Sequence, residues 1–141
     1  MNKIMGLDVG TKRIGVALSD YLLITAQPCE MVPRQPEEKA IGRLKQIAAE
    51  WNVKTIVIGL PFNMDGTKGE QAQDCIAFGS LLKNDFVVVY EDERLTSFMA
   101  EENLRRRSKP YSKHKELIDI ESACIILQEY LNRKDKTNDG L

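Results

Sequence analysis

Short apolar segments, separated by Gly, Pro, Asn and Asp, predict the strands of this chain. They lie within residues 4–18 (two strands joined by a Gly-containing turn), 24–33, 55–60 and 86–90. Pro28 and Pro33 restrict the third strand to an edge of the sheet, because proline has no N–H for the hydrogen-bond ladder. The last two segments are almost entirely apolar, which predicts strands buried on both faces.

Apolar residues at helical spacing predict four helices. These span approximately residues 36–51, 70–82, 97–107 and 117–132. Pro36 suits the first turn of the first helix, where its missing N–H costs nothing. The polar segment 133–141 has no periodicity and predicts a disordered tail, so we expect one folded domain over residues 1–132.

The order of these elements predicts an α/β fold with a five-stranded mixed sheet. The first three strands follow one another and form an antiparallel meander. Each of the last two is reached through a helix and is expected to lie parallel to the first, by a right-handed crossover. Ligands of such sheets bind outside the carboxyl ends of the strands. This rule brings together Asp8, the loop 59–69 and Glu93.

Composition narrows the class of protein. The chain has 141 residues, and its 43% hydrophobic and 29% charged residues are typical of a water-soluble domain. A net charge of −1 gives no overall attraction to nucleic acid, so any such attraction must be local. Three widely spaced cysteines, Cys29, Cys75 and Cys124, argue against a disulfide framework or a zinc site. With no signal peptide or membrane-spanning run expected, they favour a reducing cytoplasm.

Asp8 is the first candidate for chemistry. Strand residues alternate between faces, so Ile4, Gly6 and Asp8 share one side of a strand that is otherwise apolar. A buried carboxylate requires a cation, a hydrogen-bond network or a metal. Gly6 and Gly10 leave room for a substrate to approach the backbone. The alternative is that Asp8 only caps a turn.

Asp119 is the second candidate, near the start of the last helix. It borders the apolar stripe one turn before Ala123, and the small Ser122 and Ala123 leave space beside the helix. Glu121 lies about 200° away around the helix and is expected to face solvent. The alternative is an acidic first-turn residue favoured by the helix dipole. With Asp8 and Glu93, Asp119 predicts an acidic cluster without His or Cys, a donor set that suits Mg²⁺ or Mn²⁺.

Four motifs along the chain carry a family resemblance. They are Gly6-x-Asp8-x-Gly10-Thr11-x-Arg13-Ile14-Gly15-Val16-Ala17, Gly59-Leu60-Pro61-x-Asn63-Met64-Asp65-Gly66-Thr67, Asp92-Glu93-Arg94-Leu95-Thr96-Ser97 and Ile118-Asp119-x-x-Ser122-Ala123-x-x-Ile126-Leu127. In this order they resemble the YqgF (RuvX) family, over residues 4 to about 131. The resemblance implies an RNase H-like three-layer α/β/α fold and a likeness to Holliday-junction resolvases. It also implies a nuclease that matures the 5′ end of pre-16S rRNA.

The resemblance also implies the roles of the acidic residues. Asp8, Glu93 and Asp119 would be the catalytic carboxylates and the metal ligands, expected to hold two Mg²⁺ or Mn²⁺ ions. In two-metal sites one ion activates the attacking water and the other stabilises the leaving oxygen. The sequence departs from the family at Glu121, where a small or apolar residue is usual. A different rotation of the helix would bring Glu121 toward the metals.

Candidate substrate-binding residues surround this cluster. They are Thr11, Lys12, Arg13, Asn63, Asp65, Arg94, Arg105, Arg106, Arg107, Lys109, Lys113 and Lys115. Seven basic residues against two acidic ones between positions 94 and 115 favour contact with a phosphate backbone, although a charge run is often only a solvated helix face. Asn63 and Asp65 could equally stabilise their own turn. His114, the only histidine, is a candidate general acid.

Three functions remain open at this stage. The first is an RNA-processing nuclease of the cytoplasm, acting on pre-rRNA or ribosomal precursor particles, as a monomer or homodimer. The second is a four-way DNA junction resolvase acting on branched DNA, which would use the same chemistry. The third is a non-catalytic nucleic-acid-binding factor, which would not need the acidic triad. Asp8-x-Gly10-Thr11 also resembles the phosphate loop of actin-like kinases, but one domain leaves no room for their second. We expect no membrane partner.

Overall fold

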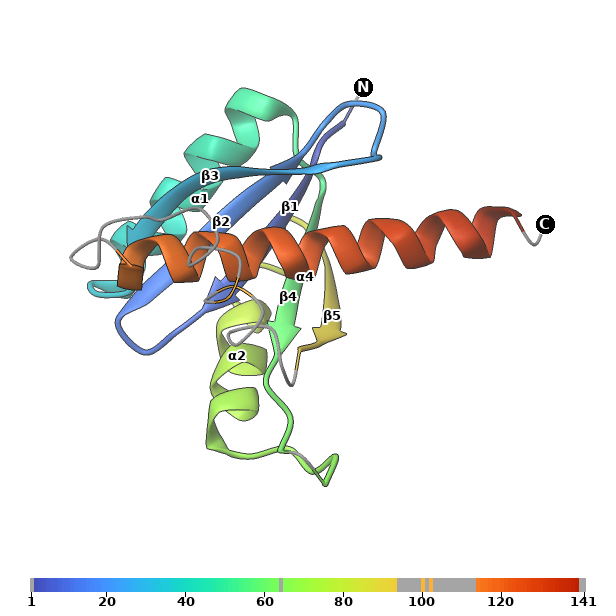
Figure 1. Ribbon diagram of the computed structural model, residues 1–141. Coiled ribbons are helices and arrows are strands. Elements are labelled where there is room, and N and C mark those ends of the chain that lie inside the picture. Colours follow the sequence, from blue (N-terminus) through green and yellow to red (C-terminus); the bar gives the residue numbers. More distant parts are fainter. Residues whose placement is uncertain (1, 64, 94–99, 101, 103–113, 140–141) are drawn as a thin grey trace.

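The structure is a computed structural model that describes residues 2–63, 65–93, 100, 102 and 114–139 (Figure 1). Its elements are β1 (Ile4–Val9), β2 (Arg13–Ser19), β3 (Ala26–Pro33), α1 (Glu37–Trp51), β4 (Thr55–Leu60), α2 (Glu70–Ser80), β5 (Val87–Asp92) and α4 (His114–Asp139). The strand order is β3-β2-β1-β4-β5, with β1, β2 and β3 antiparallel and β4 and β5 parallel to β1. The predicted α/β class and mixed five-stranded sheet are therefore confirmed.

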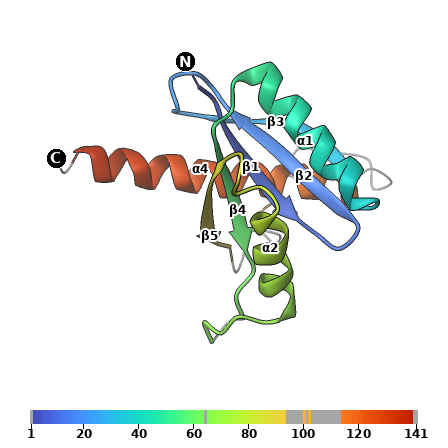
Figure 2. The same ribbon diagram turned by 180° about the vertical axis from the view of Figure 1, so that it is seen from behind.

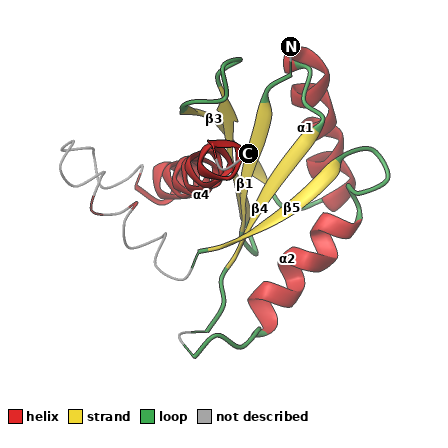
Figure 3. Ribbon diagram, turned by 90° about the vertical axis from the view of Figure 1, so that its right-hand side faces the viewer, coloured by secondary structure: helices red, strands yellow, loops and turns green. Residues whose placement is uncertain are grey.

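The helices cover the two faces of the sheet in separate layers. α1 and α2 lie on one face (Figure 2), and α4 crosses the other (Figure 3). Because successive side chains of β1 point to opposite faces, they are divided between these two layers. Met5, Leu7 and Val9 are buried under α1 and α2, whereas Ile4 packs with the apolar residues of α4. Asp8, which the sequence predicted to share a side of the strand with Ile4, therefore belongs to the α4 side.

Two glycines allow α4 to lie directly on the sheet. A Cβ atom on Gly15 of β2 would lie 1.9 Å from the carbonyl oxygen of Asp119. One on Gly6 of β1 would lie 2.7 Å from Cβ of Leu127. The helix backbone thus occupies the space that side chains would fill at these positions. This close approach sets the height of Asp119 above the sheet.

We expect Gly15→Ala to lower the free energy of unfolding by at least about 2 kcal/mol, because backbone atoms of α4 must move to admit the methyl group. Gly42→Ala is the matched control. Gly42 is exposed within α1 and a Cβ there meets nothing within 4 Å, so alanine should be neutral or stabilise by up to about 1 kcal/mol. Urea unfolding of both variants measures the difference. Equal stabilities would show that α4 adjusts to the methyl group without cost.

The predictions for β5 and the C-terminal segment were wrong in part. β5 is an edge strand, not one buried on both faces: Val87 is 62% exposed, and the strand continues to Asp92. α4 continues to Asp139, so residues 133–139 are helical where a disordered tail was predicted. Arg133, in this segment, donates two hydrogen bonds to the buried carboxylate of Glu91 on β5.

Other boundaries differ only slightly from the prediction. α1 begins directly after Pro36, α2 ends at Ser80, and β3 begins at Ala26. Of the predicted helix 97–107, only Ala100 and Glu102 belong to the described residues, and both are helical. None of the helices, over the residues described, is long and apolar enough to cross a membrane.

Candidate active site at the carboxyl ends of the parallel strands

Asp8 lies near the carboxyl end of β1, on the side covered by α4. It is paired in register with Gly15 of β2, the residue against which the Asp119 backbone packs. Burial, and then the negative charge of Asp119, raise the pKa of Asp8 to about 7. The Asp119 charge acts on Asp8 although the two residues lie far apart in the sequence. The prediction that their strand and helix meet is therefore confirmed.

Glu93 follows β5 and is held from two sides. Its backbone N–H donates to the carbonyl of Leu60 at 3.1 Å, and the residue is only 8% exposed. Its carboxyl group lies against Gly59, where an added Cβ would be 2.7 Å from Cδ of Glu93. Burial, followed by the charges of Asp8, Asp92 and Glu129, raises its pKa to about 9. Asp8 is thus electrostatically coupled to Asp119 on one side and to Glu93 on the other.

Asp119 has a basic partner that sequence reasoning did not find. Nε of Arg13 donates to Oδ2 of Asp119 at 2.6 Å, and their side chains are 33% and 20% exposed. Arg13 was expected to bind substrate. Arg13 and Gly15 point to the same face of β2, so the packing of α4 on Gly15 was the signal that could have revealed the pair. That packing is not visible in the local sequence.

The donor set fits a hard divalent cation. Among the described residues, the charges that act on Asp8 and Glu93 are all negative: Asp119 acts on the first, and Asp8, Asp92 and Glu129 act on the second. Buried carboxylates in such a position gain most from a metal ion. Over the described residues, no three His, Cys, Asp or Glu side chains already form a metal-binding group. Asp119 is instead directed to Arg13.

A second arginine fixes the turn that follows Asp8. Nη1 of Arg34 donates to the carbonyl of Gly10 at 2.9 Å, and both terminal nitrogens bind Asp74 of α2 at 2.9 and 3.0 Å. The guanidinium also lies over the ring of Phe78, 4.8 Å from its centroid. From α2, Gln71 donates to the carbonyl of Val9 at 3.1 Å. The backbone just after Asp8 is thus attached to α2 by side chains that sequence reasoning missed.

We expect Arg34→Gln to lower the free energy of unfolding by about 2 kcal/mol, because it leaves Asp74 without its partner. It should also lower kcat about tenfold, since it releases the turn that positions Asp8. Asp74→Asn is the comparison, because Arg34 can still hold Gly10 and kcat should fall much less. Urea unfolding and single-turnover cleavage measure the two effects. An unchanged kcat in Arg34→Gln would limit this residue to stabilising the fold.

The loop after β4 is held by its own side chains. Asp65 accepts hydrogen bonds from the backbone and the hydroxyl of Thr67 at 3.0 and 2.7 Å. Asn63 donates to the same hydroxyl at 3.0 Å. Gly66 has a φ of 90°, which favours glycine. These contacts support the interpretation as a stabilised turn, and substrate binding by Asn63 and Asp65 stays a prediction.

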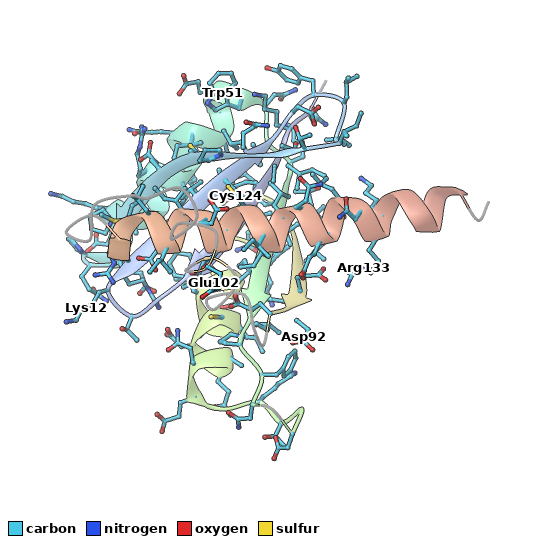
Figure 4. All side chains as sticks on the ribbon, in the orientation of Figure 1. Lys12, Trp51, Asp92, Glu102, Cys124 and Arg133 are labelled. Atoms are coloured by element: carbon cyan, nitrogen blue, oxygen red, sulfur yellow. The ribbon has the colours of Figure 1, made fainter. Side chains whose placement is uncertain are left out.

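The remaining candidates are distributed as follows. Thr11 and Lys12 are exposed in the β1–β2 turn, and Lys12 lies at the left of the view, below Trp51 (Figure 4). Glu121, expected to face solvent, is half-buried and lines a small hollow with Ala26 and Gln128. The other candidates fall outside the described residues or have side chains that do: Arg94, Arg105, Arg106, Arg107, Lys109, Lys113, His114 and Lys115.

Comparisons with known proteins show the family of this chain. The family model described as "RuvX: Holliday junction resolvase" matches residues 2–133. The chain is 45% identical, over 132 residues, to the "Putative pre-16S rRNA nuclease" of Desulforamulus reducens, covering 92% of this chain and 96% of that protein. It is also 45% identical over 134 residues to the protein of the same name from Clostridioides difficile, covering 94% and 95%.

Solved structures confirm the RNase H-like fold. Thermus thermophilus RuvC in complex with a Holliday junction substrate superimposes with a TM-score of 0.58 at 14% identity, covering 97% of this chain and 98% of that one. The fowlpox virus Holliday junction resolvase gives a TM-score of 0.55 at 13% identity, covering 93% and 99%. At these identities the likeness concerns the fold alone.

Proposed function

The chain belongs to the RuvX family and is a nuclease, and we propose that it matures the 5′ end of pre-16S rRNA with divalent metal ions held by Asp8, Glu93 and Asp119. The observation that carries the assignment of the site is the coupling of these carboxylates. Asp8 lies within the electrostatic reach of both other acids, at the sheet edge where the parallel strands β1, β4 and β5 end. Clustered like charges of this kind mark functional sites.

The carboxylates would act by binding and orienting the metal. When bound, Mg²⁺ or Mn²⁺ supplies an activated water nucleophile and stabilises the leaving oxygen. Asp8 is placed by the β1 ladder and Asp119 by the packing of α4 on Gly15. Glu93 is placed by its backbone bond to Leu60. Three separate elements thus position the three proposed ligands, which lowers the cost of orienting them around a metal.

The β1–β2 turn is suited to the substrate backbone. Thr11 and Lys12 are exposed beside the carboxyl end of β1. Arg34 holds the same turn in place by binding both the carbonyl of Gly10 and Asp74 of α2. Contacts of this kind go to phosphates and carry no sequence information. We propose that the basic residues between positions 94 and 115 extend the same surface. The protein would act in the cytoplasm, on precursor rRNA or the particles that contain it, as a monomer or a homodimer.

Cleavage of a four-way DNA junction is the second candidate, because the matching family model is described as a Holliday junction resolvase. Both substrates present the same phosphodiester bond, so the acidic cluster is compatible with either. The difference must come from how branched or folded nucleic acid fits around the site.

The test is a comparison of two labelled substrates under identical conditions. One is 16S rRNA with its 5′ precursor extension, and the other is a DNA four-way junction. Each is incubated with the protein in Mg²⁺, in Mn²⁺ and in EDTA. We expect metal-dependent cleavage at the 5′ end of the rRNA. Preferential cleavage of the junction would favour the resolvase, and binding without cleavage in any metal would identify a non-catalytic factor.

A further inference from the structure

The ion pair between Arg13 and Asp119 has a feature that the other arginine pairs lack. It is made by a single nitrogen, Nε. Arg34 binds Asp74 through two nitrogens and is only 7% exposed, and Arg43 binds Glu30 through two nitrogens at 2.8 and 2.6 Å. Over the described residues, the terminal nitrogens of Arg13 have no acceptor. Arg13 is therefore held less firmly than Arg34 or Arg43.

Arg13 also supplies positive charge to the cluster in the absence of metal. Within the described part of the chain, the charges that act on Asp8 and Glu93 are negative, whereas Nε of Arg13 lies 2.6 Å from Oδ2 of Asp119. A divalent cation that binds Asp119 would meet this positive charge at close range and be repelled by it. The same guanidinium, at the edge of the sheet beside the exposed Thr11 and Lys12, has the fork geometry that suits a phosphate.

We propose that Arg13 has two positions: it binds Asp119 while the metal is absent, and it moves to a backbone phosphate of the nucleic acid when a divalent cation takes Asp119. This inference rests on the proposed function, since it takes Asp119 as a metal ligand. It assigns to Arg13 a positioning and substrate-binding role that depends on the state of the site.

Through this exchange of partners by Arg13, bound metal strengthens the binding of nucleic acid, and bound nucleic acid strengthens the binding of metal. A phosphate that draws Arg13 away removes the repulsion at Asp119, and a metal at Asp119 releases Arg13 for the phosphate. Because such coupling is reciprocal, each ligand raises the affinity for the other by the same factor. The metal would then load preferentially when substrate is present. The opposing possibility is that Arg13 stays on Asp119 and orients it, which would raise metal affinity.

Calorimetric titration of Mn²⁺ into the free protein separates the two roles. We expect Arg13→Gln to bind Mn²⁺ three- to tenfold more tightly than the wild type, and Arg13→Lys to lie closer to the wild type. Arg43→Gln is the matched control, because it breaks an arginine–carboxylate pair with Glu30 of β3, outside the acidic cluster, and should leave Mn²⁺ affinity unchanged. Thermal unfolding monitored by circular dichroism confirms that each variant is folded.

Two further measurements follow the arginine itself. In ¹⁵N-labelled wild type, Mg²⁺ should shift the Nε–H resonance of Arg13 while that of Arg34 stays in place. In Ca²⁺, which takes the same oxygen ligands, the salt dependence of RNA binding should become shallower in Arg13→Gln by about one unit of log–log slope. Equal or weaker Mn²⁺ binding by Arg13→Gln would overturn the inference and leave the proposed function intact. Failure of the wild type to bind Mn²⁺ and to cleave rRNA would overturn both.

Discussion

Asp8→Asn should lower the rate of metal-dependent cleavage by about a thousandfold or more at saturating substrate. Asparagine has nearly the shape of aspartate but lacks the charge that would hold the metal, so the loss should appear in kcat. Asp8 interacts electrostatically with both Asp119 and Glu93, so removing its charge should affect the whole cluster. Single-turnover cleavage of labelled rRNA measures the effect.

Asp85→Asn is the control for this experiment. Asp85 is an exposed carboxylate that precedes β5, so it lies at the amino ends of the parallel strands, whereas Asp8 lies near their carboxyl ends. It pairs with Lys45 at 3.1 Å. Its neutralisation should leave cleavage unchanged. Asp8→Asn should meanwhile be at least as stable as the wild type without metal, because a buried charge has been removed. Near-normal turnover of Asp8→Asn would remove this residue from the active site.

Without metal, the protein should lose stability steadily as the pH rises from about 4 to about 9. The pKa of Asp8 is raised from 3.8 to about 7, and that of Glu93 from 4.5 to about 9. Between the unfolded and folded pKa of each group, the folded state binds more protons, so raising the pH favours unfolding. Each pH unit over which one such group is protonated only in the folded state costs about 1.4 kcal/mol.

Glu93→Gln isolates this effect from all other titrating groups. Glutamine stays neutral, so the variant should unfold at a higher temperature than the wild type at pH 8 to 9 in EDTA, and its stability should fall less between pH 5 and 9. At pH 5 the two proteins should be similar, since Glu93 is protonated in the folded wild type. Thermal melts over this pH range provide the measurement. A variant less stable than the wild type at pH 9 would contradict the raised pKa of Glu93, which comes from its burial and then from the neighbouring acids.

The arrangement of the strands could be predicted from the sequence, because it depends on turns, prolines and connecting helices that are recognisable in short segments. The hairpin at residues 4–18, the prolines of β3 and the helices that precede β4 and β5 predicted the antiparallel meander, the edge position of β3 and the parallel direction of β4 and β5. The exposure of β5 was not predicted, because an apolar run reads the same in a central and an edge strand. The helical extension of α4 was missed because its pair between Arg133 and Glu91 joins residues far apart in sequence.

Asp8 was found because it stands out in an apolar strand, and Asp119 because it borders an apolar helix stripe. Glu93 lies in an acidic run and was singled out by its place at the end of a predicted strand and by the family resemblance. The basic partners at the site were not found. The pair between Arg13 and Asp119 spans 106 positions, and the contact of Arg34 with Asp74 spans 40. Both depend on how helices pack on the sheet. An arginine on an exposed strand end gives no local sign of its acceptor, so packing had to be known before the electrostatics of the site could be described.

A crystal soaked in Mn²⁺ tests the central claim most directly, because anomalous scattering locates the metal independently of any assay. The proposed site predicts a Mn²⁺ peak bounded by carboxylate oxygens of Asp8, Glu93 and Asp119, at coordination distances of about 2.0–2.4 Å. Asp8→Asn crystals treated in the same way should lose the peak or most of its height. A peak elsewhere on the molecule, or none in a protein that cleaves rRNA in Mn²⁺, would show that these three residues are not the metal centre.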